Sequence, residues 1–235
     1  MTERLKDRVA IVMGAGASGP GWGIGKATSA AFAREGARVF AVDVRLEAAE
    51  ETRAAIESEG GHCVAHAANA LDEASVTAAV AACIAAFGQI DILFNNVGGG
   101  IPGDPVEMSV ADWQANIDLN LTPLFVTAKC VLPVMRRQGR GSIVNVASIA
   151  GIRDLPDSGV SYQAAKAGVL QLSRSIAARS AADGIRSNCI LPGYIDTPEI
   201  TRRLIAKFGE NHAREVHDIR AAKCPDGTLG TGWDI

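Results

Sequence analysis

The sequence predicts an α/β fold, a doubly wound parallel sheet enclosed by helices in three layers. Apolar, β-branched segments alternate with longer alanine-rich segments of helical periodicity along all 235 residues. Strands that are apolar along nearly their whole length are typical of a parallel sheet covered on both faces, with right-handed crossovers. No shift in composition marks a second domain, so we expect one domain over residues 1–235.

This alternation gives each element an expected position. The expected strands are Val9–Met13, Arg38–Asp43, Cys63–Ala67, Ile90–Asn95, Ser142–Ala147 and Ile185–Leu191. The expected helices are Ile24–Glu35, Glu47–Glu59, Glu73–Phe87, Ala111–Arg137 and Ser161–Ala182. The more highly charged segment Thr197–Lys223 also has helical periodicity. We expect it to form a helical lid over the substrate rather than a layer of the core.

Composition narrows the range of functions. Apolar residues make up 48% of the chain and charged residues 21%, a balance typical of globular proteins. A chain of this length can bury a core that needs no metal or disulfide. The net charge of −3 argues against a nucleic-acid-binding protein. Five cysteines without a CxxC pair, and four histidines without cysteines at zinc spacing, predict reduced thiols and no metal site.

The sequence shows neither a signal peptide nor a membrane span. The first ten residues, MTERLKDRVA, are charged from the third residue onward, unlike a secretory signal. The longest uncharged run, Ala74–Ile90, falls short of a membrane span. We therefore expect a cytoplasmic protein that has no membrane or nucleic-acid partner.

A glycine-rich segment follows the first expected strand directly. Six glycines occur in the twelve residues Gly14–Gly25, between a strand and a helix. Glycine permits positive φ and a close approach of the backbone to a pyrophosphate, and the following helix N-terminus offers free N–H groups to the anion. The segment therefore predicts a dinucleotide site. The alternative is a glycine-rich surface turn.

Asp43, at the end of the second expected strand, bears on the choice of cofactor. Its carboxylate could accept hydrogen bonds from the adenosine ribose and would repel a 2′-phosphate, which favours NAD over NADP. Arg45 is the counter-argument because arginine can bind that phosphate. A simple solvated acid is the alternative for Asp43. We expect NAD because the acid at the strand tip lies closer to the ribose.

Tyr162 and Lys166 lie four residues apart in a helical segment and therefore share one helix face. An ammonium beside a phenol favours the phenolate, and a pKa lowered by roughly 2–3 gives a general base about 3–4 kcal/mol of help. Ser148 follows the strand SIVNVA, at the strand end where ligands bind in such folds. The alternatives are a surface lysine beside a half-buried tyrosine, and an ordinary serine at a strand end.

Further motifs follow in order along the chain. Asn95-Asn96-Val97-Gly98 follows the fourth expected strand, Asn120 lies in DWQANIDLN, and Asn188–Thr197 has the pattern N-x-x-x-P-G-x-x-x-T. With the glycine segment, Asp43, Ser148, Tyr162 and Lys166, these motifs resemble the classical short-chain dehydrogenase/reductase family over essentially the whole chain. A buried Asn95 or Asn96 that serves only the sheet is the alternative for its motif.

The resemblance implies a Rossmann fold and a role for each matching residue. Tyr162 would be the general acid/base, Lys166 would lower its pKa and bind the nicotinamide ribose, and Ser148 would orient the substrate oxygen. Asn120 would hold a water in a proton relay to Lys166, and the Ile195 backbone would meet the carboxamide. The residues expected to bind NAD are Gly14, Gly16, Gly19, Gly23, Ile24, Gly25, Asp43, Asn69, Asn96, Gly98, Tyr162, Lys166, Pro192, Gly193, Ile195 and Thr197.

Two features of the nucleotide end depart from the family pattern. Eight residues separate Gly14 from Gly23, more than the usual three, and Met13 replaces a threonine. Asn69 stands where the family usually has an aspartate that contacts the adenine. Its amide can still donate and accept hydrogen bonds, so we expect dinucleotide binding to be retained.

A third departure is the end of the chain, which stops at Ile235 whereas family members continue with a helix and a last strand. We expect a truncated C-terminus, with Ile185–Leu191 as a sheet edge. The unpaired backbone groups of such an edge could pair with another chain or be covered by Thr197–Lys223. We expect a homodimer or homotetramer, weakened if the C-terminus is truly missing.

Together these observations predict an NAD-dependent oxidoreductase that interconverts a secondary alcohol and a ketone by hydride transfer. The alternative is a non-catalytic dinucleotide-binding sensor or scaffold of the same fold, which would need only the glycine segment and Asp43. The identity of the small-molecule substrate stays open. Its binding residues are expected in Ile149–Gly159, Tyr194 and Thr197–Lys223, with the polar candidates Arg153, Asp154 and Asp157.

Overall fold

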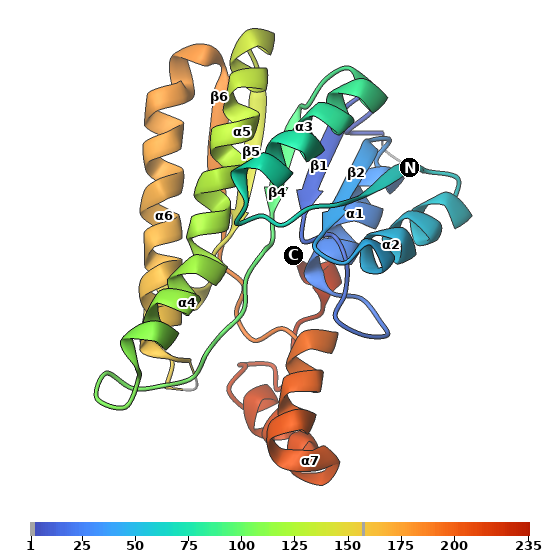
Figure 1. Ribbon diagram of the computed structural model, residues 1–235. Helices are drawn as coiled ribbons and strands as arrows, with labels where there is room; N and C mark the ends of the chain where they lie inside the picture. The colour runs from blue at the N-terminus through green and yellow to red at the C-terminus, as the bar shows by residue number, and fades with distance from the viewer. Residues whose placement is uncertain (1–2, 157) are drawn as a thin grey trace.

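Six parallel strands form one sheet in the order β3-β2-β1-β4-β5-β6 (Figure 1). The computed structural model describes residues 3–156 and 158–235, and within them the side chains of Lys207, Phe208 and Asn211 are not described. The sheet confirms the predicted doubly wound α/β fold. Its strands are β1 Val9–Met13, β2 Arg38–Asp43, β3 His62–Ala67, β4 Ile92–Asn95, β5 Gly141–Val146 and β6 Ile185–Ile190.

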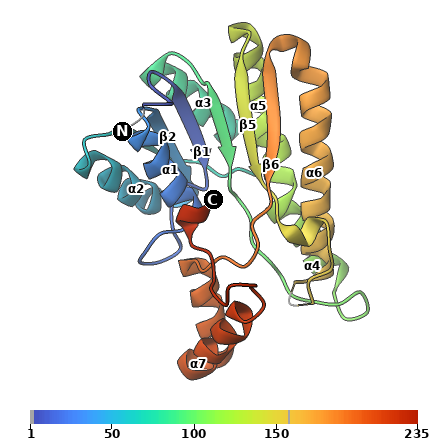
Figure 2. The same ribbon diagram turned by 180° about the vertical axis from the view of Figure 1, so that it is seen from behind.

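Helices pack on both faces of the sheet, with α1 and α2 on one face and α3, α5 and α6 on the other (Figures 1 and 2). Three short 3₁₀ helices follow β5, α6 and the lid: η1 Ile149–Gly151, η2 Ala181–Asp183 and η3 Gly232–Asp234. The α-helices are α1 Ile24–Arg34, α2 Leu46–Ser58, α3 Glu73–Phe87, α4 Val110–Asn120, α5 Thr122–Gln138, α6 Val160–Ser180 and α7 Pro198–Ala221.

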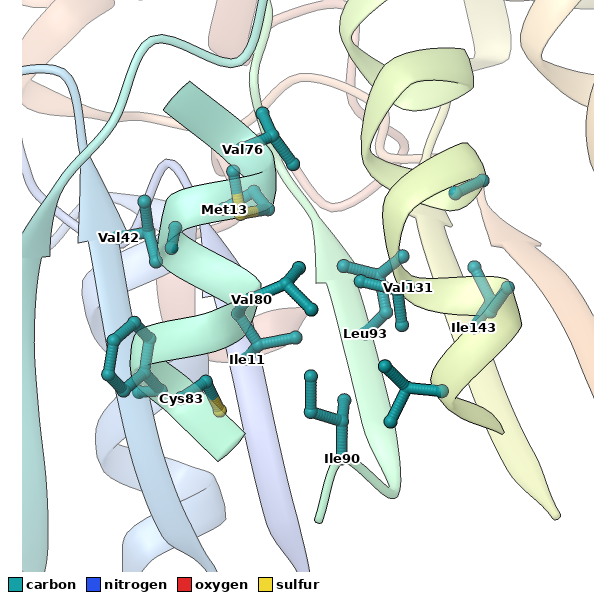
Figure 3. Packing of buried hydrophobic residues seen from close by; sticks show 14 of the residues in the cluster. Ile11, Met13, Val42, Val76, Val80, Cys83, Ile90, Leu93, Val131 and Ile143 are labelled. Carbon is teal, nitrogen blue, oxygen red and sulfur yellow. The ribbon is translucent and has the colours of Figure 1, made fainter. Parts of the chain in front are cut away.

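The core on the two faces follows from the alternation of side chains along each strand. Ile11 of β1 belongs to the cluster beneath α3 and α5, whereas Val12 belongs to the cluster beneath α1 and α2. Figure 3 shows Val80 and Cys83 of α3 beside Ile11. Fully burying one such aliphatic side chain contributes about 1.5–3 kcal/mol to folding, so the core holds the strands in a fixed register.

That register brings the strand ends together. Met13 at the end of β1 pairs with Val42 of β2 on one side and with Asn95 of β4 on the other. The loops that follow these three strands therefore begin side by side at one edge of the sheet. Residues expected to bind the dinucleotide are carried by these loops.

One predicted helix, Ala111–Arg137, is in fact two helices, α4 and α5, separated at Leu121. Pro123 lies in the first turn of α5 and has no N–H to donate, so a continuous helix would lose a hydrogen bond at that position. The break places Asn120 at the end of α4, where its side chain is fully buried. By length and hydropathy alone, Val110–Gln138 also matches a membrane span, a criterion that core helices meet as well.

The strand β6 forms one edge of the sheet, as predicted. Its Arg186 and Asn188 are exposed, while Ile185 and Ser187 are buried against the rest of the sheet and α6. Masking of this edge by Thr197–Lys223 is not observed. In both views α7 lies beyond the carboxyl ends of the strands instead of beside β6 (Figures 1 and 2).

Candidate active site

The carboxyl ends of the strands open into a cavity of about 1000 Å³. Loops after all six strands, the start of α6 and both ends of α7 contribute to its walls. All of the predicted site residues line this cavity except Gly19, Gly25 and Asn120. The topology therefore brings the nucleotide motifs and the tyrosine motif, far apart in the chain, to one place.

Three glycines of the predicted segment are sterically required. Gly14 has a φ of +75°, and a Cβ there would lie 3.3 Å from the backbone of Asn96. A Cβ on Gly16 would lie 2.8 Å from Oδ2 of Asp43, and one on Gly25 would collide with the carbonyl oxygen of Gly14. The segment thus forms a tight backbone cradle at the N-terminus of α1.

Asp43 holds this cradle in position. Its Oδ2 accepts a hydrogen bond from the Gly16 N–H at 3.0 Å, and its Oδ1 accepts one from the Arg45 N–H at 3.1 Å. The Arg45 guanidinium donates to the carbonyl oxygen of Ala17 at 2.7 Å. Asp43 and Arg45, the two residues that bear on the choice of cofactor, are therefore both hydrogen-bonded to the glycine segment.

Two asparagines complete the nucleotide side. The Asn96 amide donates to the carbonyl of Gly14 at 2.9 Å, which ties the loop after β4 to the cradle. Asn69 lies in the loop after β3, where its Oδ1 accepts a hydrogen bond from the Leu71 N–H at 3.0 Å. Asn95, in contrast, faces the core, where its amide donates to Asn145 at 2.9 Å.

The lengthened glycine segment packs against the end of the chain. The rings of Trp22 and Trp233 have centroids 4.6 Å apart, and the Arg34 guanidinium lies over Trp233 at 4.5 Å. A Cβ on Gly232 would lie 2.9 Å from the carbonyl oxygen of Gly23. Two of the departures from the family pattern, the longer glycine segment and the end of the chain, are therefore packing partners.

The first turns of α6 present the tyrosine motif to the cavity. Lys166 is 3% exposed and its Nζ donates to the carbonyl of Val146 at 2.8 Å. The same Nζ lies 5.6 Å from the centroid of the Tyr162 ring. Ser148 accepts a hydrogen bond from the Ala150 N–H at 3.1 Å, so its own proton is left to donate elsewhere.

Burial dominates the ionisation of this group of residues. Desolvation lowers the pKa of Lys166 from 10.5 to about 8. Desolvation also raises the pKa of Tyr162, while hydrogen bonding to Ser148 and the positive charge of Arg203 act in the opposite direction. Tyr162 is therefore a neutral phenol at pH 7, the form that can donate a proton.

Asn120 lies behind this group rather than in the cavity wall. Its Oδ1 accepts from the Gly99 N–H at 3.0 Å and its Nδ2 donates to the Gly99 carbonyl at 2.7 Å. A Cβ on Gly98 would lie 2.9 Å from Asn120 Oδ1 and 3.2 Å from Lys166 Nζ. The absence of a side chain at Gly98 lets the amide and the ammonium converge.

The loop after β6 forms another part of the cavity wall. Pro192 accepts a hydrogen bond from the Ile149 N–H at 3.1 Å, and Ile195 forms a parallel bridge with Gly230. The hydroxyl of Thr197 caps α7 by accepting from the Ile200 N–H at 3.4 Å. The expected lid, Thr197–Lys223, therefore starts at a cavity-lining residue.

The lid contributes charged residues that the sequence reasoning missed: Glu199, Arg203 and Arg220 line the cavity. The signal that could have found them is Gly209, whose φ of +73° breaks α7 into two halves that both face the cavity. Arg153 and Asp154, the predicted polar candidates, do not line it. Asp157 lies outside the described residues.

Metal-ligating groups are not assembled in the described part of the chain, where no cluster of three or more His, Cys, Asp or Glu side chains could hold an ion. The cysteines there are all reduced. Burial raises the pKa of the Cys63 and Cys83 thiols to about 12, so neither is an available thiolate.

A glycine cradle and a Tyr–Lys–Ser group, whose lysine and serine are buried, lie together at the carboxyl edge of a doubly wound sheet. This combination defines a dinucleotide-type oxidoreductase architecture. The short chain dehydrogenase model matches residues 8–206. The protein belongs to the short-chain dehydrogenase/reductase family, whose members include dehydrogenases that act on alcohols.

Relatives with assigned activities support this membership. The chain is 41% identical to cis-4-hydroxycyclohexanecarboxylate dehydrogenase of Sinomonas cyclohexanicum, over 100% of this chain and 88% of the relative. It is 37% identical to cyclohexanol dehydrogenase of Acinetobacter sp. (strain SE19), over 93% of this chain and 83% of the relative.

Solved structures agree in fold. A short-chain dehydrogenase/reductase of Burkholderia xenovorans superposes with a TM-score of 0.93 at 42% identity, covering 98% of this chain and 87% of that structure. NAD⁺-bound xylitol dehydrogenase superposes with a TM-score of 0.87 at 28% identity, covering 98% of this chain and 90% of that structure.

Proposed function

We propose that this protein is an NAD-dependent oxidoreductase that interconverts a secondary alcohol and a ketone, with Tyr162 as the general acid/base. The observation that carries the proposal is the placement of Tyr162 and Ser148 in the wall of a cavity that also contains the glycine cradle. Buried Lys166 lies behind the phenol ring. Alcohol dehydrogenation needs these groups in one place.

The residues present fit a nicotinamide dinucleotide. The cradle has no room for side chains at Gly14, Gly16 or Gly25, and it ends at a helix N-terminus, which suits a pyrophosphate. When bound, the dinucleotide accepts a hydride from the alcohol or gives one to the ketone. We propose that it is held by Gly14, Gly16, Gly23, Ile24, Asp43, Asn69, Asn96, Gly98, Pro192, Gly193, Ile195 and Thr197.

Proton transfer is the part assigned to the chain itself. In reduction, the Tyr162 phenol gives its proton to the substrate oxygen and becomes a phenolate. In oxidation, the phenol first releases its proton to water through the relay, and the resulting phenolate Oη takes the hydroxyl proton. Ser148 donates a hydrogen bond to the same substrate oxygen, because its Oγ already accepts from Ala150. The Lys166 ammonium favours the phenolate and so assists removal of the proton. Asn120 holds the Gly99 backbone and is proposed to support a water-mediated relay to Lys166.

A preference for NAD is supported by Asp43, whose carboxylate is anchored by the cradle at the end of β2. A carboxylate at this point accepts hydrogen bonds from ribose hydroxyls and repels a 2′-phosphate. The Arg45 guanidinium is engaged by the Ala17 carbonyl, which competes with any role in binding that phosphate. One similar structure is named as NAD⁺-bound.

Burial of Lys166 argues against the sensor alternative. A buried ammonium destabilises the fold unless it is well compensated, and Lys166 donates to a neutral acceptor, the Val146 carbonyl. A protein that only binds a dinucleotide could use the ammonium to contact the ribose, but it would not need a phenol beside that charge in the cavity wall. We infer from the two alcohol-dehydrogenating relatives that the substrate is a cyclic secondary alcohol or the matching ketone.

The direct test is a spectrophotometric assay of the purified chain. Cyclohexanol, 4-hydroxycyclohexanecarboxylate and linear secondary alcohols are each offered with NAD and then with NADP. We expect reduced NAD to accumulate with a cyclic alcohol, faster than reduced NADP. Tight binding of NADH without turnover of any alcohol or ketone would favour the sensor instead.

A further inference from the structure

The two halves of α7 each bring one arginine to the substrate side of the cavity. Gly209 separates the halves, and Arg203 and Arg220, one on each side of it, both line the cavity. Hydrogen bonding distinguishes the two guanidinium groups. Among the described residues, Arg203 has hydrogen-bond acceptors, whereas Arg220 Nε has none.

Arg203 is occupied by the protein. Its Nη1 donates to the carbonyl of Gly100 at 2.9 Å, and its Nε donates to Glu199. A Cβ on Gly100 would lie 3.8 Å from Arg203 Nη1 and 3.9 Å from Cδ2 of Tyr162, so this arginine lies near the tyrosine. Arg203 thus connects the first half of α7 to the loop after β4. Few of its guanidinium N–H groups are left to bind a ligand.

Arg220 lacks equivalent partners. Its guanidinium lies 5.2 Å from the centroid of the Tyr194 ring. Its Nε is buried and has no hydrogen-bond partner among the described residues, and Arg220 takes part in none of the salt bridges found among them. Arg220 nevertheless lines the cavity, so its guanidinium charge would attract an anionic acceptor that enters there.

The surroundings of Arg220 define the rest of the ligand. Val216 and Ile219, from the same half of α7, line the cavity with it, as do Leu155 and Pro156 from across the opening. The acids in the cavity wall are already engaged: Asp43 by backbone N–H groups and Glu199 by arginines. Around Arg220, the pocket therefore combines an apolar wall with a cation that no described carboxylate neutralises.

We propose that Arg220 is a specificity-determining residue that binds a substrate carboxylate, so that the preferred substrate is a hydroxy acid or keto acid with an apolar skeleton. The planar guanidinium matches the two oxygens of a carboxylate. The skeleton lies against the apolar wall, and the hydroxyl or carbonyl reaches Tyr162 and Ser148. This inference rests on the proposed alcohol–ketone chemistry.

The kinetic test compares two substrates of nearly equal shape, 4-hydroxycyclohexanecarboxylate and its neutral carboxamide, each with NAD. The parent protein should have the higher kcat/KM for the acid. Arg220→Met should lower kcat/KM for the acid about 10–100-fold, mainly through KM, and should change it less than about threefold for the amide. The matched control is Arg214→Met, which removes the same charge from an exposed position on the same half of α7.

A binding measurement separates failure of this inference from failure of the proposed function. Cyclohexanecarboxylate, which has no hydroxyl to oxidise, is titrated calorimetrically into the NADH-saturated protein. Binding should be lost in Arg220→Met and kept in Arg214→Met. Turnover of neutral alcohols without Arg220-dependent carboxylate binding would overturn the inference alone. Carboxylate binding without turnover of any alcohol would overturn the proposed function alone. Tighter binding of cyclohexanesulfonate would overturn the carboxylate assignment.

Discussion

Lys166 is the residue at which the requirements of the site and of the fold conflict most clearly. Its ammonium is desolvated, which lowers its pKa to about 8, yet the proposed chemistry needs the positive charge beside Tyr162. At pH 7 the lysine is mostly protonated, and its burial destabilises the folded state. Under the proposed mechanism, this buried charge lowers the stability of the fold while it favours the phenolate of Tyr162.

This conflict predicts the pH dependence of stability. Below pH 8 the lysine is protonated in both the folded and the unfolded chain, so the unfavourable burial is fully present. Between pH 8 and 10.5 the unfolded chain holds the proton that the folded chain has lost, so the free energy of unfolding rises with pH. The rise due to this residue is about 3 kcal/mol.

The check is chemical denaturation of the parent and Lys166→Met across this pH range, without cofactor. Groups that titrate in both proteins cancel in the difference. Between pH 8 and 10.5, the free energy of unfolding of the parent should rise by about 3 kcal/mol more than that of the variant. If the free energies of unfolding of the two proteins changed in parallel with pH, Lys166 would not be strongly desolvated.

Asp43 carries the second residue-scale prediction. Asp43→Ala should weaken NAD binding about 10-fold or more and narrow its advantage over NADP, since hydrogen bonding and charge repulsion both disappear. Asp43→Asn keeps an acceptor for the cradle but removes the charge, so it should improve NADP binding with a smaller effect on the cradle. Dissociation constants for both reduced dinucleotides measure the effect. Tighter binding of NADPH than NADH by the parent would contradict the assignment and implicate Arg45.

At the scale of elements, the strand and most helix positions could be predicted because side-chain periodicity reports burial. β1, β2 and α3 have the predicted bounds, and the other strands differ by one or two residues at their ends. The break between α4 and α5 was missed although Pro123 is visible, because the apolar pattern continues across it. The long-range partners of an element leave no such local pattern.

In the site, too, local features could be predicted from the sequence and long-range ones could not. Tyr162 and Lys166 could be found because their spacing is local and helical. The position of Arg220 in the cavity wall could not be predicted, because it depends on the break in α7 at Gly209 and on a cavity formed by distant loops. The contact of Trp22 with Trp233 likewise joins residues more than two hundred positions apart in sequence.

That tryptophan contact yields an element-scale prediction. Trp22→Ala and Trp233→Ala should each destabilise the protein, and a double-mutant cycle should give a coupling of about 1 kcal/mol between the two rings. Trp113 is a matched control because it is 40% exposed, as Trp233 is, and lies on α4. A cycle pairing Trp22 with Trp113 should give no coupling. Equal coupling in the two cycles would show that the ring contact does not fasten the lengthened glycine loop.

At the scale of the whole molecule, function depends on the carboxyl edge of the sheet. The cradle and Asp43 belong to the first half of the chain, whereas Ser148, Tyr162 and Lys166 belong to the second half. They meet because β1 and β4 are neighbours at the centre of the strand order. α7 contributes further residues to the wall of this cavity, among them the charged side chains of Glu199, Arg203 and Arg220.

The central claim is that this cavity performs alcohol–ketone chemistry through Tyr162. It is tested most directly by measuring two properties of Tyr162→Phe: turnover of the alcohol that the parent oxidises fastest, and the dissociation constant for NADH. The ring is kept and only the transferable proton is lost. The variant should therefore lose about 100-fold or more in kcat while binding NADH within about twofold of the parent. A variant that keeps more than about a tenth of the parent kcat would contradict the role given to Tyr162.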